Sequence, residues 1–179
     1  MKQKIAGLIT IAFICLLTFS AFKHPFFNYQ VLYCGLNQTG TLTGGLLQQT
    51  TATLQKGKGK STGTTYSIEG TKSLTQRFKI GDQCFQVLSS TGQPEPSAYV
   101  SLYKLTVEKT TRSFTINTDG SANSGLIPIQ LISVTTGSPN YKVFLGPGAS
   151  LFQGEYVFVD KSTITTDGKI TVWAFGIDQ

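Results

Sequence analysis

The sequence predicts an all-β protein: an antiparallel β-sandwich of about eight or nine strands, preceded by one N-terminal apolar helix. After Pro25, no window of ten or more residues places apolar side chains at the i, i+3, i+4 spacing of a helix. Short runs rich in Val, Ile, Thr, Tyr and Phe recur instead, and Gly, Pro, Asn and Asp separate them. Such regularly spaced short strands are typical of sandwiches and barrels.

The predicted strands are short and follow one another through the rest of the chain. They cover residues 29–34, 74–80, 83–89, 99–107, 112–116, 126–134, 141–145, 156–159 and 170–175. Residues 35–56 give a weaker pattern, with leucines scattered among Thr and Gln. Gly81 and Asp82 predict a hairpin between the second and third runs. Pro128 interrupts the run 126–134, which indicates an edge strand or a bulge.

A low-complexity stretch at residues 55–65 predicts a mobile, exposed basic loop within a single β-domain that covers residues 25–179. Lys56, Lys58 and Lys60 alternate there with glycine, and Ser and Thr follow. Glycine at this density prevents burial in a core. The three lysines are therefore expected in solvent, where they are available for contact with an anionic surface.

Residues 1–24 have the pattern of a signal peptide or a membrane anchor. A basic start precedes a charge-free apolar stretch at 5–22, and Lys23 closes it. The stretch has the minimum length that spans a bilayer, so two outcomes stay open. After cleavage, the protein is free in the periplasm, at the cell surface or outside the cell. Without cleavage, residues 5–22 anchor it to the inner membrane.

The cysteines agree with export. Cys15 lies in the apolar stretch, which leaves Cys34 and Cys84 in the β-domain. Two cysteines in an exported domain are candidates for a disulfide, and the alternative is a pair of buried free thiols. The spacing alone does not decide between the two states.

One local pattern resembles a feature of known folds. Leu151, Gly154 and Tyr156 resemble the tyrosine corner of immunoglobulin-like and fibronectin-type sandwiches, which implies a structural role for the Tyr156 hydroxyl. Two departures are clear: Phe158 stands where antibody domains have a cysteine, and Trp173 lies in the last strand. The C-terminal stretch is also similar to the ends of uncharacterised exported bacterial proteins, a resemblance that implies no activity.

Chemical motifs are weak, and we expect no enzyme, cofactor or metal site. His24 is the only histidine and adjoins the apolar stretch, so a Ser-His triad has no base within the β-domain. Gly59-Lys60-Ser61 lacks the earlier glycine of a phosphate-binding loop, because Leu54 stands in its place. The acids considered for a glycosidase pair are Asp82, Glu108, Glu155 and Asp160.

The sequence therefore favours an exported, non-enzymatic protein that acts by surface contact in adhesion, scaffolding or assembly. Its partner is expected to be a protein or a glycan at the cell surface. A net charge of +6 spread over the chain is too small to indicate nucleic-acid binding. The alternatives are a glycan-binding module, which needs a solvent-facing pair of aromatic rings, and an envelope hydrolase, which needs a pocket with convergent polar groups.

Overall fold

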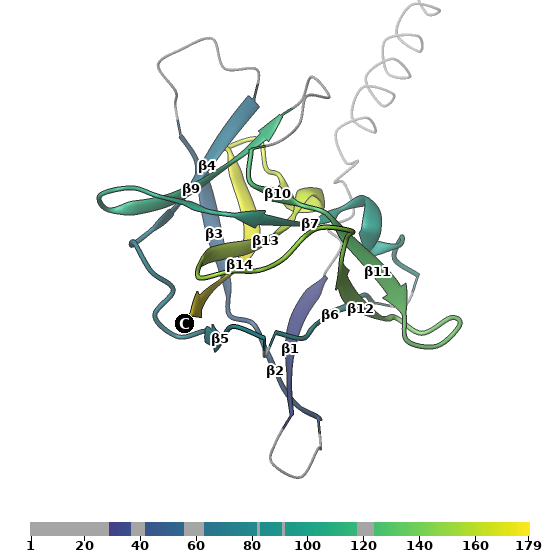
Figure 1. The fold of residues 1–179 in the computed structure, drawn as a ribbon. Helices are drawn as coiled ribbons and strands as arrows, with labels where there is room; N and C mark the ends of the chain where they lie inside the picture. The colour runs from purple at the N-terminus through teal and green to yellow at the C-terminus, as the bar shows by residue number, and fades with distance from the viewer. Residues whose placement is uncertain (1–28, 37–41, 56–62, 82, 91, 118–123) are drawn as a thin grey trace, which may run out of the picture.

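The computed structural model confirms an all-β protein built mainly from antiparallel strands (Figure 1). It describes residues 29–36, 42–55, 63–81, 83–90, 92–117 and 124–179. The predicted signal peptide or anchor at 1–24 lies outside these residues. Among the residues it does describe, no helix has the length and apolarity to cross a membrane.

The smaller sheet has five strands in the order β11-β12-β6-β1-β2. Their bounds are Ile129–Ser133 for β11, Asn140–Leu145 for β12, Phe85–Leu88 for β6, Gln30–Leu36 for β1 and Leu42–Leu46 for β2. Every neighbouring pair is antiparallel. The edge strands of this sheet are β11 and β2.

The larger sheet has nine strands, eight of them in the order β10-β7-β13-β14-β3-β4-β9-β8. Their bounds are Leu126–Ile127 for β10, Val100–Lys104 for β7, Gly154–Asp160 for β13, Lys169–Asp178 for β14, Gln49–Leu54 for β3, Gly63–Glu69 for β4, Thr111–Asn117 for β9 and Thr106–Val107 for β8. The ninth strand, β5 (Arg77–Lys79), pairs with the end of β14 in parallel. Two short 3-10 turns, η1 (Pro96–Ala98) and η2 (Lys161–Thr163), complete the described elements.

Two hydrophobic cores lie on opposite faces of the larger sheet. The first fills the space between the sheets, where Val31 and Val87 of the smaller sheet meet Phe158 and Phe175 of the larger one. The second contains residues from one face of the larger sheet only, among them Tyr66, Phe114 and Val159 in β4, β9 and β13. These strands contact one another because the larger sheet curls around its own face.

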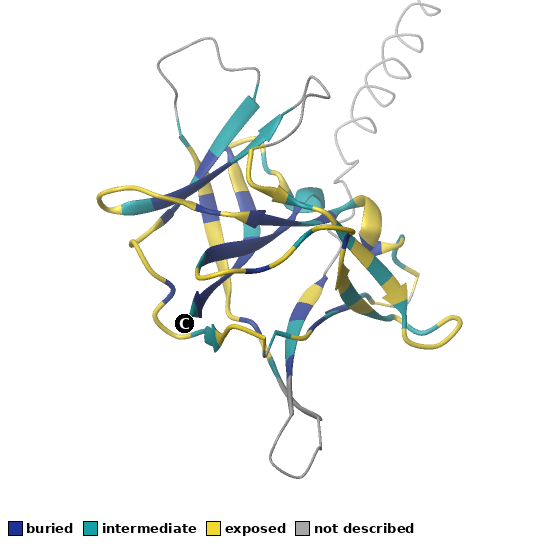
Figure 2. Cartoon of the chain, in the orientation of Figure 1, coloured by how far each residue is buried: buried dark blue, intermediate teal, exposed yellow. Residues whose placement is uncertain are grey.

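The central strands β13 and β14 are buried on both faces over most of their length, which Figure 2 shows in dark blue. Along β13, Tyr156 and Phe158 face the core between the sheets, whereas Val157 and Val159 face the curl. A strand that is buried on both sides has a continuous apolar run in place of strict alternation. The sequence Tyr-Val-Phe-Val fits this requirement.

Several predicted boundaries are wrong in informative ways. The described residues form fourteen strands, more than the eight or nine that were predicted. Residues 42–54, which gave a weak pattern, form β2 and β3, since pairing with β1 and β14 outweighs a Thr-rich and Gln-rich composition. The expected loop at 55–65 is also shorter, because β4 begins at Gly63 and pairs with β9.

The hairpin predicted at Gly81 does not form. The strand before it, β5, belongs to the larger sheet, and the strand after it, β6, belongs to the smaller one. Gly81 has a φ of 93°, the conformation expected of a turn glycine, but the turn here joins two sheets. A local turn signal does not specify which strands pair.

The interruption predicted at Pro128 is confirmed. Leu126–Ile127 pairs with β7 at the edge of the larger sheet, and Ile129–Ser133 pairs with β12 at the edge of the smaller one. Because proline has no N–H to donate to a ladder, it suits the point at which the chain leaves one sheet for the other. The single predicted run is thus two edge strands in different sheets.

Candidate functional site

β11 is an edge strand of the smaller sheet, so one side of its backbone has no neighbouring strand. The Gly146 N–H donates to the Pro128 carbonyl at 2.7 Å, and the Val134 N–H donates to the Asn140 carbonyl at 2.9 Å.

 The ladder between β11 and β12 therefore uses the backbone groups of the even-numbered residues, as antiparallel pairing alternates. The N–H and C=O groups of Ile129, Leu131 and Ser133 point to the open side, where no described residue bonds to them.

The β11 strand contains no charged residue and no proline that would hinder pairing with another strand. The five residues of β11 are Ile, Gln, Leu, Ile and Ser, and Ile132 is 51% exposed. Natural edge strands are usually shortened, charged or covered, because an unpaired ladder is a template for another strand. The edge strands β10 and β8 of the larger sheet have two residues each, and β8 is followed by Glu108 and Lys109. Among these edges, β11 is long and uncharged.

Cys34 and Cys84, which the sequence left open between two states, form a disulfide with their Cα atoms 5.0 Å apart. Cys34 lies in β1, and Cys84 lies just before β6, the neighbouring strand. The Cys34 N–H also donates to the Cys84 carbonyl at 2.8 Å. The disulfide therefore links two adjacent strands of the smaller sheet at its centre.

The residues of the corner pattern lie together at the start of β13. The Tyr156 hydroxyl donates to the Phe152 carbonyl at 2.8 Å and accepts from the Phe152 N–H at 3.0 Å. Leu151 is buried in the core between the sheets. Gly154 has a φ of 157°, and a Cβ there would lie 3.4 Å from Lys104 Cε. The Tyr156 hydroxyl thus holds the segment that enters β13.

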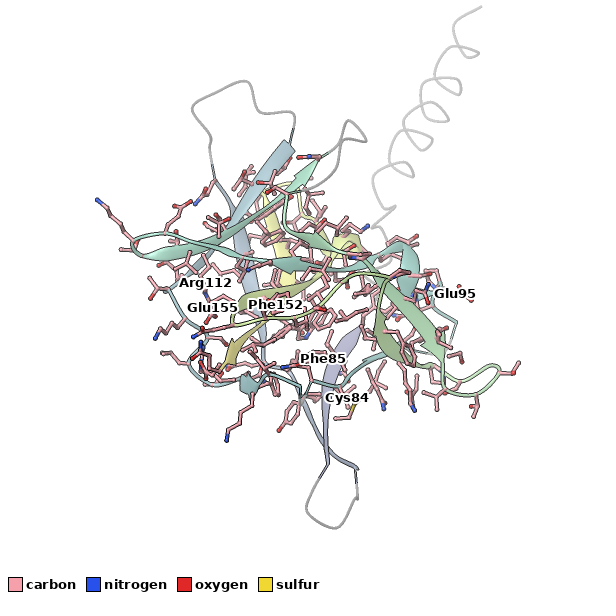
Figure 3. The ribbon with its side chains drawn as sticks, viewed as in Figure 1. Cys84, Phe85, Glu95, Arg112, Phe152 and Glu155 are labelled. Atoms are coloured by element: carbon pink, nitrogen blue, oxygen red, sulfur yellow. A yellow bond between two sulfur atoms is a disulfide. The ribbon has the colours of Figure 1, made fainter. Side chains whose placement is uncertain are left out.

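A buried cluster of charged side chains lies at the mouth of the curl, where Figure 3 labels Arg112 and Glu155. Glu155 Oε2 accepts from Arg112 Nη1 at 2.8 Å and from the Ser73 N–H at 2.8 Å. Glu155 Oε1 accepts from Arg77 Nη1 at 2.7 Å. Arg112 Nε donates to the Gly70 carbonyl at 3.0 Å. The buried carboxylate therefore attaches the segment 70–77 to β13 and β9.

Arg77 extends the cluster to the C-terminal end of β14. Its Nε and Nη2 donate to the two carboxylate oxygens of Asp178 at 2.8 and 2.5 Å. These hydrogen bonds hold the pKa of Asp178 below its usual range. The guanidinium lies directly over Gly176, where a Cβ would overlap it. The Arg77–Asp178 pair therefore adds a side-chain link to the parallel backbone pairing between β5 and β14.

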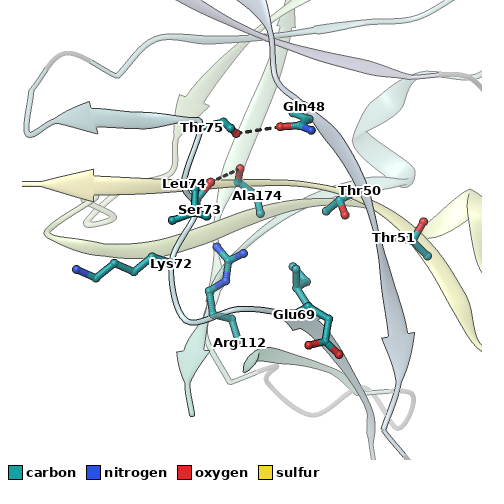
Figure 4. A pocket seen from close by; sticks show the side chains of 11 residues that line it. Gln48, Thr50, Thr51, Glu69, Lys72, Ser73, Leu74, Thr75, Arg112 and Ala174 are labelled. Atoms are coloured by element: carbon teal, nitrogen blue, oxygen red, sulfur yellow. Dashed lines mark hydrogen bonds between the residues drawn. The ribbon is translucent and has the colours of Figure 1, made fainter. Parts of the chain in front are cut away.

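A pocket of about 350 Å³ opens beside this cluster (Figure 4). Its lining comes from β3, β4, β9, β14 and the segment 70–77, so it sits at the mouth of the curled sheet. The lining includes Thr50, Ile68, Glu69, Lys72, Arg112 and Ala174. Pockets at the open ends of curled or closed sheets are common places for ligands.

The remaining predicted features do not converge on a site. Glu155 and Asp160 lie at opposite ends of β13, and Asp160 instead accepts from the Ser162 N–H and hydroxyl at 2.9 and 2.6 Å. Burial raises the pKa of Asp160. Among the described aromatic side chains, Phe144 and Phe152 are exposed on separate elements. Asp82 and the basic residues Lys56, Lys58 and Lys60 lie outside the described residues.

The charged cluster was missed by the sequence analysis, although one signal pointed to it. Arg112 shares the alternation of Phe114 and Ile116 in β9, and Glu155 shares that of Val157 in β13. An arginine and a carboxylate on inward positions of two strands predict a buried ion pair. Strand order was needed to bring those two positions together.

Comparisons with known proteins add no assignment. No protein-family model matches the chain, and neither a curated protein nor a solved structure does. The function must therefore be argued from the surfaces described above.

Proposed function

We propose that this is an exported, non-enzymatic β-protein that acts by surface contact, and that it binds a partner by adding a strand at the β11 edge. The observation that carries the proposal is the unpaired backbone of Ile129, Leu131 and Ser133 on a five-residue strand without charge. An extended segment beside β11 receives hydrogen bonds from these groups and continues the sheet.

The side chains of β11 favour the same interaction. Ile129 and Leu131 pack against the core between the sheets, but both remain only partly buried. The core is therefore open along this edge. A partner strand with apolar residues at alternate positions covers both side chains and gains hydrophobic contact in addition to main-chain hydrogen bonds.

The proposal also includes the compartment in which the protein acts. The basic start and the apolar stretch at 5–22 support export, with or without retention as an anchor. The Cys34–Cys84 disulfide supports an oxidising compartment. The Tyr156–Phe152 hydrogen bonds support a relation to immunoglobulin-like sandwiches, whereas the parallel strand β5 and the curled larger sheet are departures from that arrangement.

Paired substitutions on exposed side chains test the proposal. Gln130→Lys with Ile132→Lys adds two charges to β11 while leaving its ladder to β12 and its inward residues intact. Gln49→Lys with Thr53→Lys adds the same charge to exposed positions of β3, an interior strand, outside the lining of the pocket. We expect the β11 variant alone to lose co-purification of partners from the producing cell. Equal capture by both variants contradicts strand addition at β11.

A further inference from the structure

The pocket at the mouth of the curled sheet is a second feature, independent of the β11 edge. Thr50 in β3, Ile68 in β4, Arg112 in β9 and Ala174 in β14 supply its strand residues. The segment 70–77 forms its other wall, held in place by the Ser73 N–H bond to Glu155. The walls are thus fixed by the buried ion cluster before any ligand arrives.

Arg112 brings an unused donor to this pocket. The side chain is 5% exposed, and its Nε and Nη1 are taken by Gly70 and Glu155. No described residue accepts a hydrogen bond from Nη2. Every fully buried side-chain nitrogen or oxygen among the described residues does have a partner, so Nη2 keeps contact with solvent. Because Arg112 lines the pocket, its two Nη2 hydrogens are offered there (Figure 4).

The charges around the pocket balance. Glu155 compensates Arg112, and the lining contains one further cation, Lys72, and one further anion, Glu69. The site therefore offers little electrostatic attraction to a strongly anionic or cationic ligand. The groups that remain are donors from Arg112 and Lys72, an acceptor in Glu69, and the Thr50 hydroxyl, which both donates and accepts.

Apolar surface lies among these polar groups. Leu74, which is 89% exposed, lines the pocket, and so do the buried Ile68 and Ala174 of the core inside the curl. A ligand that matches the site thus has several hydroxyl groups on its edge and C–H surface on its faces. The pocket volume of about 350 Å³ limits the size of this ligand, because it is at the lower end of the range for ligand pockets.

We infer that this pocket binds a neutral sugar unit. Arg112 Nη2 donates to ring or hydroxyl oxygens, Glu69 accepts from sugar hydroxyls, and the Thr50 hydroxyl bonds to either kind of group. Leu74 contacts the C–H face of the ring. This site differs from the glycan-binding module considered from the sequence, because polar side chains of a pocket take the place of a solvent-facing aromatic pair.

Saturation-transfer NMR on the full chain tests this inference, with glucose, galactose, mannose and N-acetylglucosamine as millimolar probes. Thr50→Val removes a hydroxyl from the pocket with little change in shape. Thr53→Val is the matched control, because it lies three residues along the same strand and outside the lining. We expect transfer to at least one sugar, a dissociation constant raised about fivefold by Thr50→Val, and no change with Thr53→Val.

Three results overturn the inference. The first is the absence of transfer to all four sugars. The second is sugar binding that Thr50→Val leaves unchanged, which places the sugar elsewhere. The third is binding of triglycine or acetate in a manner sensitive to Thr50→Val while the sugars do not bind, which assigns the pocket to another ligand class. None of these results bears on strand addition at β11.

Discussion

Arg112 and Glu155 form an ion pair of 2.8 Å between Nη1 and Oε2, with side chains that are 5% and 6% exposed. The pair joins β9 to β13 across the mouth of the curled sheet. Burying either charge alone is costly, since water no longer solvates it. We therefore expect the largest loss of stability when only one of the two residues is replaced.

A double-mutant cycle tests this pair. We expect Arg112→Met to lower the free energy of unfolding by ~3–5 kcal/mol, because it leaves the Glu155 carboxylate buried with one fewer cation. Glu155→Met should have a comparable effect. The double variant should be destabilised by clearly less than the sum, as measured by urea unfolding. Additive effects contradict the pairing.

Asp178 gives the protein a specific pH dependence. Its hydrogen bonds from Arg77 lower its pKa in the folded state below the usual 3.8. A carboxylate with a lowered pKa adds stability above its unfolded pKa, and this contribution is lost as the pH falls through the folded value. Asp178→Asn should thus be less stable than the wild type at pH 7.

The same comparison in acid completes this test. The difference between wild type and Asp178→Asn should shrink as the pH falls below 3.8. Thermal unfolding in a background of Arg77→Gln serves as the control, since Asp178 then has no guanidinium partner and its substitution should have little effect at either pH. A difference that persists unchanged in strong acid contradicts the account.

The fold class was predictable because it depends on local patterns. The alternation that buries Tyr29 with Val31 and Phe85 with Val87 is visible in the sequence, as is the break at Pro128, and all three match the structure. Strand pairing was not predictable. Arg77 gives no local sign that it pairs with Asp178, 101 residues later, or that β5 pairs with β14 in the larger sheet.

The Cys34–Cys84 disulfide should contribute substantially to stability. It closes a loop with a sequence separation of 50 residues, which restricts the unfolded chain. We expect Cys34→Ala with Cys84→Ala to lower the free energy of unfolding by about 4 kcal/mol. Reductant should destabilise the wild type and leave the double variant unaffected. Wild-type unfolding that is insensitive to reductant contradicts the linkage.

The Tyr156 hydroxyl is expected to contribute through its two bonds to Phe152. Tyr156→Phe removes both bonds and should cost about 1–2 kcal/mol in chemical unfolding. Tyr66→Phe is the matched control: Tyr66 is also buried, and no described residue bonds to its hydroxyl. Equal losses in the two variants show that the corner hydrogen bonds add nothing.

The candidate site was only partly predictable. The run around Pro128 pointed to an exposed edge, because proline excludes a central strand. The direction of the free backbone groups required the register of β11 on β12. The pocket was invisible in the sequence, since Thr50, Arg112 and Ala174 meet only through the curl of the larger sheet.

Site-specific photo-crosslinking in the living producing cell tests strand addition most directly. A benzophenone amino acid at Gln130 lies on the exposed face of β11, and one at Thr53 on β3, outside the pocket lining, is the control. We predict a discrete crosslinked product from Gln130 that is absent from Thr53. The absence of any product at Gln130, or the same product from both positions, contradicts a partner strand at this edge.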